Sequence, residues 1–317
     1  MNIAYLILAH NQPQLLIREV ERLNQANAHF FIHIDKKNEQ DFFFLKEHFR
    51  VYANVSIISE QKIYWMGFNM VKATIRLLEL AHSSKVQFKY YVLLSGQDYP
   101  IKPNEYINEF FGKYNCDFIA YNPMEYLDDI FKNKVSYYHH FDNGYTNPRS
   151  ASRVPWMVKL YYGLHRRLDK YMPRRKFFKG YTPYFGSQWF ALTGDTVKYI
   201  LDFLARNKKY IRFMKFTEGP DEVFFQTIIL NSERRHNVYD YDDFTAWQKG
   251  RKEGAVFVHK YSSLRYMDWS EQLKVKPAIL DKGYYETLAA SNDLFARKFD
   301  ENISGELLDE IDWTLLK

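Results

Sequence analysis

Short apolar runs alternate along the first 120 residues with segments in which apolar residues recur every three or four positions. Runs of about 4 to 8 apolar residues predict buried strands, and the wider spacing predicts helices that bury one face. We predict strands over residues 3–9, 30–35, 54–59, 90–94 and 116–120, and helices over residues 13–24 and 68–83. Strands separated by helices indicate right-handed crossovers. The chain therefore predicts an α/β fold with a mainly parallel central sheet flanked by helices.

Polar and aromatic residues stand after these predicted strands. His10 follows the first strand, Asp35 the second, Trp65 the third, and Asp98 the fourth, directly beyond a Ser95–Gly96 turn. Ligands of parallel sheets bind beyond the carboxyl ends of the strands. Asp35 is suited to accept hydrogen bonds from a base or ribose, and Asp98 to line a sugar site. Trp65 fits either the wall of a nucleotide site or the layer between sheet and helix.

The segment over residues 186–232 contains a candidate general base. Gly219 and Pro220 predict the cap and first residue of a helix, with Asp221 and Glu222 in its first turn. Unpaired amides and the helix dipole favour negative charge there, so Glu222 is expected to stay ionised. A positioned, ionised carboxylate is what a general base requires. The same position is equally typical of a glutamate that only complements the helix dipole.

The composition limits the class of protein. The chain has 317 residues, of which 46% are hydrophobic and 26% charged, as in globular proteins. Its single cysteine excludes an internal disulfide, and we identify neither a signal peptide nor an apolar run long enough to span a membrane. These features predict a cytoplasmic protein. The 18% of aromatic residues fit sugar-stacking platforms, but they equally fit a ring-rich core.

The net charge of +6 is concentrated in one segment. Residues Arg149–Lys179 contain ten basic residues against the single acid Asp169, and apolar residues from Met157 to Tyr171 follow a helical spacing. A basic amphipathic helix binds an anionic membrane surface or an anionic acceptor. A packed helix with a solvated basic side has the same pattern. No nucleic-acid-binding motif accompanies the basic residues, so we expect no nucleic-acid partner.

Motifs of other enzyme classes are missing from the sequence. No G-x-G-x-x-G follows the first strand and no P-loop occurs, which argues against a Rossmann dinucleotide enzyme and a P-loop NTPase. An Asp-x-Asp pair, Asp240 and Asp242, lies after the Glu222 segment rather than at a central strand end, and we assign it to a solvated loop. We therefore expect no metal ion. A glycosidase would need two carboxylates flanking the bond, for which Asp98 and Glu222 are the candidates.

Eight segments carry a specific resemblance. In order along residues 4–300 they are AYLILAHNQP, FFIHIDKK, IYWMGFNMVKA, YYVLLSGQDYPIKP, GSQWFALT, GPDEVFFQTI, LRYMDW and LFARKFD. Together they resemble the Core-2/I-branching enzyme family, which includes β-1,6-N-acetylglucosaminyltransferases and peptide O-xylosyltransferases. The resemblance implies a GT-A type glycosyltransferase forming a single domain over residues 1–317. We divide it into a nucleotide-binding half, residues 1–120, and an acceptor-binding and catalytic half, residues 121–317, with a C-terminal diphosphate-binding segment.

The resemblance also implies roles for individual residues. Glu222 falls on the family's base, which deprotonates the acceptor hydroxyl, Lys298 on a lysine that contacts the UDP diphosphate, and Asp35 on an aspartate near uracil. A second basic contact to the diphosphate falls on Lys276 or Arg265. We assign four further residues to substrate binding: Ser187, Gln188, Trp189 and Asp221. Trp189, in the apolar run WFAL, fits a core position as well as a sugar-stacking one.

The predicted reaction is an inverting, metal-independent sugar transfer that needs no cofactor. The donor is a UDP-sugar, with N-acetylglucosamine favoured over xylose or another hexose, and the acceptor is a hydroxyl of a glycan or lipid-linked glycan. Fixed Lys or Arg side chains can stabilise the departing diphosphate without a metal. The family's eukaryotic members carry several cysteines and a membrane anchor, and their absence here fits a bacterial cytoplasmic enzyme. The alternative is a non-catalytic basic module that binds carbohydrate or nucleic acid.

Overall fold

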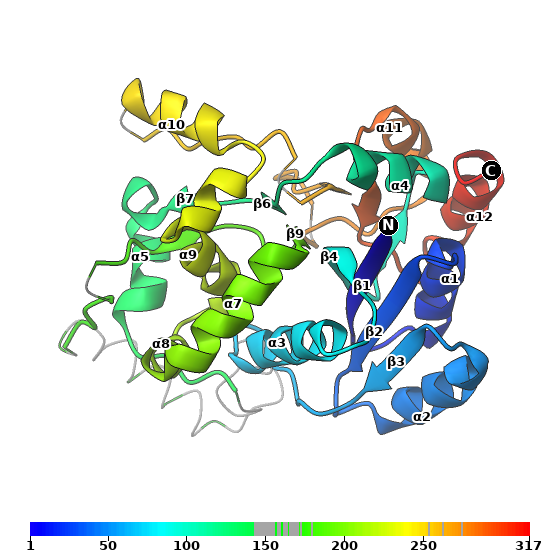
Figure 1. Cartoon of the computed structure of the whole chain (residues 1–317), viewed down its shortest axis with the longest axis horizontal. Coiled ribbons are helices and arrows are strands. Elements are labelled where there is room, and N and C mark those ends of the chain that lie inside the picture. Colours follow the sequence, from blue (N-terminus) through cyan, green and yellow to red (C-terminus); the bar gives the residue numbers. More distant parts are fainter. Residues whose placement is uncertain are drawn as a thin grey trace.

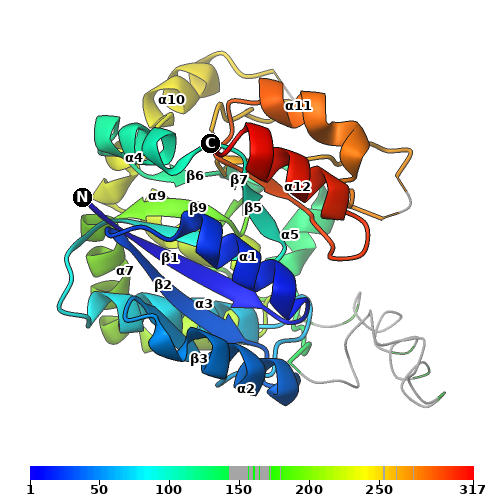
Figure 2. The ribbon, with the colours of Figure 1, turned by 90° about the vertical axis from the view of Figure 1, so that its right-hand side faces the viewer.

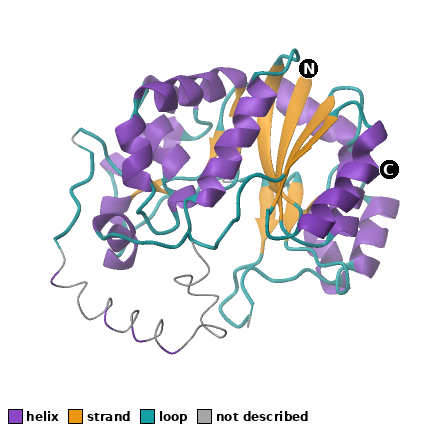
Figure 3. Cartoon of the chain, turned by 90° about the horizontal axis from the view of Figure 1, so that it is seen from below, coloured by secondary structure: helices purple, strands orange, loops and turns teal. Residues whose placement is uncertain are grey.

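The computed structural model describes residues 1–142, 156, 160, 164, 171, 173–178, 180–252, 254–261, 263–273 and 275–317. Among them the main sheet has six strands, shown edge-on in Figure 3 with helices on both sides. Their order is β3 (Val55–Ile58), β2 (Ala28–Ile34), β1 (Asn2–Ala9), β4 (Phe88–Ser95), β9 (Phe190–Thr193) and β6 (Phe118–Ile119). The first four strands are parallel, and β9 is antiparallel to both of its neighbours. The predicted α/β fold with a mainly parallel sheet is confirmed.

Side chains of β1 alternate between two cores, because successive residues of a strand face opposite sides of the sheet. Leu6 and Leu8 pack with helices α3 (Asn69–His82), α7 (Gly194–Arg206) and α9 (Phe224–Leu230). Tyr5 and Ile7 pack on the other face with α1 (Pro13–Leu23) and α4 (Asn104–Lys113). Both faces are covered by helices, which explains why β1 is an almost continuous apolar run.

A second sheet joins the C-terminal segment to the carboxyl end of β4. Its order is β10 (Arg265–Met267), β11 (Phe295–Arg297) and β5 (Asp98–Pro100). The last helix, α12 (Gly305–Thr314), lies beside α1 in Figures 1 and 2, where Arg18 donates to Asp312 at 2.7 and 2.9 Å. Residues near both ends of the chain therefore lie at one edge of the main sheet.

The remaining elements surround these two sheets. They are α2 (Glu39–His48), α5 (Asp129–Ser136), α8 (Lys208–Met214), α10 (Tyr241–Lys249), α11 (Tyr285–Ala290), the short strands β7 (Asn122–Pro123) and β8 (Tyr184–Phe185), and the 3₁₀ turns η1 (Phe49–Val51), η2 (Met124–Tyr126), η5 (Pro220–Glu222), η6 (Glu233–Asn237) and η7 (Lys282–Tyr284). Within the described ranges, no helix has the length and apolar content that a bilayer crossing requires.

Two predicted elements differ from the structure. The helix predicted to start at Pro220 begins only at Phe224, and Glu222 lies instead in η5, whose backbone bonds join residues three apart, such as Glu222 N to Gly219 O. The strand predicted over residues 116–120 is only Phe118–Ile119, because Asp117 leaves the sheet to exchange backbone hydrogen bonds with Asn237 and Tyr239. The predicted division into halves at residue 120 stays a prediction.

Candidate active site

The sheet topology brings most of the predicted site residues to one edge. His10, Asp35 and Asp98 follow the carboxyl ends of the parallel strands β1, β2 and β4. Because β9 runs antiparallel to β4, its first residues lie at that same edge, and Trp189 directly precedes them. Four segments distant in sequence therefore meet where parallel sheets usually bind their ligands.

The turn that carries Glu222 is held by a glycine. Gly219 has φ +56°, a left-handed conformation that non-glycine residues rarely adopt. Its amide donates to the carbonyl of Met66 at 3.1 Å, which ties the loop between β3 and α3 to the turn. A Cβ at Gly219 would lie 3.0 Å from Met66 Sδ and 3.2 Å from both Glu222 Oε2 and Lys134 Nζ. Glycine thus permits the close packing around the Glu222 carboxylate.

Lys134 of α5 is the partner of Glu222. Its Nζ lies 3.0 Å from Glu222 Oε2, and the lysine is nearly buried while the Glu222 side chain is one-third exposed. The same ammonium group lies 5.2 Å from the centre of the Phe185 ring. No sequence motif points to Lys134, because it lies 88 residues upstream of Glu222 in a helix without a recognisable pattern. The structure therefore holds the predicted base as a paired, partly exposed carboxylate.

Asp221, next to Glu222, has an unusual protonation equilibrium. Burial and the negative charge of Glu222 raise the pKa of Asp221 to about 7, whereas the positive charge of Lys134 lowers it. At neutral pH its carboxyl group is therefore close to the midpoint of its titration. Perturbed carboxyl groups of this kind are common at functional sites, although ion pairing alone can also produce them.

Segment 186–189 is attached to the Glu222 turn. Gly186 N donates to Glu222 O at 2.8 Å, and the buried Gln226 donates through Nε2 to Ser187 O at 2.6 Å. A Cβ on Gly186 would lie 1.8 Å from Ala120 O, so the backbones meet too closely for any other residue. Among the described residues, Gln188 Nε2 is buried without a hydrogen-bond partner. The backbone of this segment is thus attached to the turn that carries Glu222, and the substrate-binding role of Ser187 and Gln188 stays a prediction.

Trp189, the last residue of this segment, lies beside a group of charged residues. The guanidinium groups of Arg265 and Arg297 each lie 4.9 Å from the centre of its ring. Both arginines donate to the fully buried Asp98, Arg265 at 2.8 Å and Arg297 at 2.9 Å. Trp189 is itself buried, as a tryptophan of the core would be. Its ring nevertheless lies against two cations and not only against apolar groups.

The two candidates for a second diphosphate contact differ in environment. Arg265 is almost fully buried, and its other guanidinium nitrogens donate to Ser263 O and Leu93 O. Lys276 is exposed, on a segment that continues to Ala278, whose carbonyl accepts from Lys298 N at 3.3 Å. A backbone hydrogen bond thus joins Lys298 to the segment that contains Lys276. The Arg265 side chain, by contrast, is bonded to groups inside the protein.

His10 and Lys298 lie within electrostatic reach of one another. Partial desolvation of the imidazole and the positive charge of Lys298 lower the pKa of His10, while the negative charge of Asp35 opposes this shift. Asp300, two residues after Lys298, accepts from Gln12 Nε2 at 2.7 Å. The FARKFD segment is thereby fixed beside the loop that follows β1.

Asp35 organises the loops beyond β2. It is buried, accepts from the backbone of Lys37 at 3.0 Å and of Ile63 at 3.3 Å, and pairs with Lys37 Nζ at 3.2 Å. Trp65, further along the same loop as Ile63, is 39% exposed. A cavity of about 660 Å³ adjoins this region, lined by Lys36, Lys37, Asn38, Glu39, Gln40, Asp41 and Lys62. The polar residues that line this cavity lie in the region where the nucleotide is predicted to bind.

Comparison with known proteins now identifies the chain. The sequence model of the Core-2/I-branching enzyme family matches residues 3–277. The chain belongs to this family. The match covers Glu222 and every other predicted site residue except Lys298, which lies beyond residue 277. Membership agrees with the GT-A type predicted for the fold and supports the prediction of a glycosyltransferase.

Some relatives of this member of the family have a more specific name. Xylosyltransferase 2 of Rattus norvegicus is 25% identical over 99% of the chain, and xylosyltransferase 1 of Canis lupus familiaris is 24% identical over 99%. The chain spans about a third of the length of these relatives. Among solved structures, a 4-diphosphocytidyl-2C-methyl-D-erythritol synthase of Anaerococcus prevotii aligns with 83% of the chain and 88% of its own, at 16% identity and a TM-score of 0.32.

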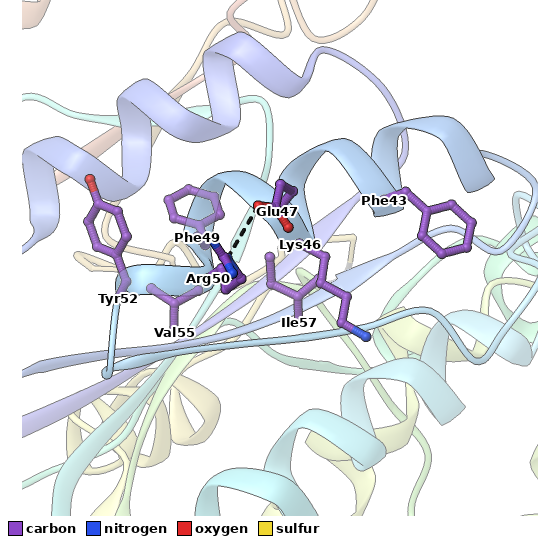
Figure 4. A pocket seen from close by; sticks show the side chains of 8 residues that line it. All are labelled: Phe43, Lys46, Glu47, Phe49, Arg50, Tyr52, Val55 and Ile57. Atoms are coloured by element: carbon purple, nitrogen blue, oxygen red, sulfur yellow. Dashed lines mark ion pairs between the residues drawn. The ribbon is translucent and has the colours of Figure 1, made fainter.

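Two further features of the chain bear on the predictions. Asp240 was assigned to a solvated loop, and this is wrong, because it is buried and lies 2.7 Å from Nδ1 of the buried His259. Within the described residues, no group of three potential metal ligands occurs. A second cavity, of about 440 Å³, lies between α2 and β3, as Figure 4 shows. None of the predicted site residues lines it.

Proposed function

We propose that this chain transfers a sugar from a UDP-sugar to a hydroxyl of a glycan or lipid-linked glycan, with inversion at the anomeric carbon. The observation that carries the proposal is the Glu222 turn. A partly exposed carboxylate is fixed there between Lys134 and segment 186–189, at the ligand-binding edge of a parallel sheet. Family membership supports the reaction class, and this geometry supports Glu222 as the base.

The reaction is a single displacement. Glu222 takes the proton of the acceptor hydroxyl, the acceptor oxygen bonds to the anomeric carbon, and the bond from that carbon to the β-phosphate oxygen breaks. UDP leaves with the electron pair of that bond. Lys298, with Lys276 or Arg265, stabilises the added negative charge, and this is the basis for proposing metal independence. The other proposed donor contacts are His10, Asp35, Trp65 and Asp98.

The proposed donor is UDP-N-acetylglucosamine or UDP-xylose. The relatives named xylosyltransferases make xylose the first alternative to test. Ser187, Gln188, Trp189 and Asp221 are the proposed substrate-binding residues beside the base. Trp189 is nearly covered, so we expect it to act on the substrate through its edge and the arginines above its ring.

A UDP-release assay tests the proposal directly. The enzyme is supplied with UDP-N-acetylglucosamine, UDP-xylose and UDP-glucose, each with mixed oligosaccharide acceptors and with or without EDTA. We expect acceptor-dependent UDP release with at least one donor, unchanged by EDTA. Release that EDTA abolishes and manganese restores would contradict metal independence, and binding of glycans without any turnover would favour the non-catalytic alternative.

We also propose that the protein acts at the cytoplasmic face of an anionic membrane through the basic segment Arg149–Lys179. Most of this segment lies outside the described residues. Three of its described residues, Trp156, Leu160 and Leu164, are exposed and spaced four apart, which supports an apolar helical stripe. Sedimentation with phosphatidylglycerol vesicles, compared with phosphatidylcholine vesicles, tests this contact. Equal recovery of the protein with both would contradict it.

A further inference from the structure

Met66 adopts a backbone conformation that is unusual for its residue type. Its φ is +66°, in the left-handed region that favours glycine. It occupies the third position of a turn that Gly67 N closes by donating to Tyr64 O at 3.0 Å, where a residue with positive φ is normally glycine or asparagine. Strained residues of this kind are concentrated at functional sites. The conformation of Met66 therefore points to a role of its side chain that glycine could not fill.

The Met66 side chain lies at the candidate base. Met66 Sδ, Glu222 Oε2 and Lys134 Nζ all lie within 3.2 Å of one point, the position that a Cβ on Gly219 would occupy. Met66 O also accepts from Gly219 N at 3.1 Å, which fixes the backbone that carries the thioether against the Glu222 turn. Both Met66 and Glu222 are half-buried, so a molecule that reaches the carboxylate also meets the methionine.

Two phenylalanines extend this apolar surface. The centre of the Phe185 ring lies 5.2 Å from Lys134 Nζ, and Phe131 of α5 packs on Phe185 with ring centres 4.7 Å apart. Both phenylalanines are half-buried. Ile130, which precedes Phe131 in the first turn of α5, is 71% exposed. Apolar side chains thus run from the candidate base, through the two rings, to the surface of the protein.

The occupant of this surface follows from its position beside the base. The acceptor hydroxyl must come within hydrogen-bond distance of Glu222, because a base takes up a proton only at that range. The atoms attached to that hydroxyl then meet Met66 and Phe185, which lie beside the carboxylate. Methionine and phenylalanine side chains offer such atoms burial and dispersion contacts rather than hydrogen bonds. An apolar group is therefore favoured there over a hydrated sugar.

We propose that Met66, Phe131 and Phe185 form a subsite for an apolar aglycone of the acceptor, so that the protein prefers a glycan joined to an alkyl chain over the same glycan free in water. Met66 is the specificity-determining residue, since in its left-handed conformation its thioether lies beside the base. This inference rests on the proposed function for the reaction, and it selects the lipid-linked acceptor from the two acceptors that the proposed function allows.

A comparison of two Michaelis constants tests the subsite. Acceptor-dependent UDP release is measured with hexyl and methyl β-glycosides of galactose, glucose and N-acetylglucosamine, so that the members of each pair differ only in their aglycone. In the pair that is used as acceptor, wild type should have a KM roughly tenfold or more lower for the hexyl glycoside, because the added methylenes are buried. Equal KM values for the two glycosides would overturn the proposal.

Two substitutions assign the preference to these residues. Met66→Gly and Phe131→Ala should each reduce it to roughly threefold or less, while kcat and the KM for the methyl glycoside change by less than about twofold. Phe43→Ala is the matched control and should equal wild type. Phe43 is a phenylalanine of α2 that is 64% exposed and lines the cavity between α2 and β3. An undiminished preference in both test variants would overturn the proposal.

Melting temperatures of the same preparations exclude an effect of misfolding. Glycine adopts a positive φ without strain, so Met66→Gly should melt at or above the wild-type temperature. A loss of preference in that variant then reflects the missing thioether and not unfolding. Met66→Gln keeps the length of the side chain and removes its apolar end, and it replaces either test variant that lacks a cooperative melting transition.

Binding without a donor separates the possible failures. The hexyl and methyl glycosides are titrated calorimetrically in the absence of any nucleotide sugar. Tighter binding of a hexyl glycoside that both substitutions remove, with no UDP release from any donor, would sink the proposed transferase and leave the apolar subsite standing. UDP release with equal KM values would sink only this inference. Neither release nor binding would sink both.

Discussion

At the scale of single residues, the candidate site depends on carboxylates held by cations. Glu222 is paired with Lys134, and Asp98 with two arginines. These pairs serve different ends. Asp98 is fully buried and paired with both arginines, whereas Glu222 retains the exposure that a base must have to meet an acceptor hydroxyl.

Replacing Glu222 with glutamine should separate catalysis from structure. Glutamine keeps the shape of the side chain and can still accept a hydrogen bond from Lys134, but it cannot take up the acceptor proton. We expect a near-normal melting temperature, near-normal UDP binding and a loss of about a hundred- to ten-thousandfold in acceptor-dependent UDP release. Glu218→Gln, which removes only a carboxylate 3.5 Å from His139, is the control. A Glu222→Gln rate above about a tenth of wild type would place the base elsewhere.

Lys134→Met should move the pH dependence of transfer. The positive charge of Lys134 lowers the pKa of Asp221, so its removal raises that pKa further above about 7. The Asp221 carboxyl group then holds its proton to higher pH, and the acid limb of the rate profile shifts to higher pH. Near pH 6.5 we expect a rate roughly two- to tenfold below wild type, recovering towards alkaline pH.

The control for this variant is Lys132→Met on the same helix, because in the described part of the chain Lys132 pairs with the exposed Asp129 at 3.6 Å. Its pH–rate profile should overlay that of wild type. A Lys134→Met profile that is lowered equally at every pH would show that the lysine acts on substrate binding rather than on the carboxyl groups.

At the scale of elements, the site depends on backbone segments that pack against one another. Gly186 lies against Ala120 at the end of β6, and Gly219 lies against Met66 of the loop before α3. These two contacts hold segment 186–189 and the turn that carries Glu222 to the residues that follow β6 and β3, the two edge strands of the main sheet. Rigid attachment of this kind is what positions a base within hydrogen-bond reach of an acceptor.

Gly186→Ala should disrupt this packing. Its methyl group would fall 1.8 Å from Ala120 O, a backbone atom that cannot move aside, and we expect destabilisation by about 3 kcal/mol or more together with loss of UDP release. Gly112→Ala is the matched control, because nothing lies within 4 Å of its Cβ and it occupies α4. That change should stabilise the protein by roughly 0.5–1 kcal/mol. Urea unfolding measures both, and a Gly186→Ala protein as stable as wild type would contradict this account.

At the scale of the whole molecule, charge is distributed to support an anionic ligand. The protein carries a net charge of +6, and the C-terminal segment brings Arg297 and Lys298 to the ends of β1 and β4. Helices α1 and α12 secure this arrangement through Arg18 and Asp312. The tertiary fold thus collects cations that are far apart in the sequence at the edge of the main sheet.

The buried Glu19 predicts how stability changes with pH. Its pKa is raised in the folded protein, so its favourable contribution is complete below the unfolded value of 4.5 and is lost as pH rises towards the folded pKa. Glu19→Gln does not titrate. Its melting temperature relative to wild type should therefore increase between pH 5 and pH 8, by about 2 °C or more. Glu21→Gln should show no such trend, and a constant difference for Glu19→Gln would indicate that Glu19 is ionised in the folded protein.

The sequence by itself determined the elements with strong apolar periodicity. The strands β1, β2, β3 and β4 and the helices α1 and α3 lie within two residues of their predicted bounds, because each is buried on a face that its own pattern specifies. Helix α2 was not predicted, since Phe43 and Phe44 are exposed and blur its periodicity. The ordered motifs also gave the family, which the match over residues 3–277 confirms.

Only the tertiary structure decided which groups surround the candidate base. Lys134 pairs with Glu222 across 88 residues, and Arg265 and Arg297 meet at Asp98 across 167 and 199 residues. The sequence pattern singles out Glu222, Asp98 and Arg265, but it carries no signal for their pairing, because each contact arises from how helices and sheets pack rather than from spacing along the chain. The burial of Asp240 and Glu19 escaped prediction for the same reason. Local sequence fixes which face of an element is apolar, whereas the partner of each buried charge depends on the whole fold.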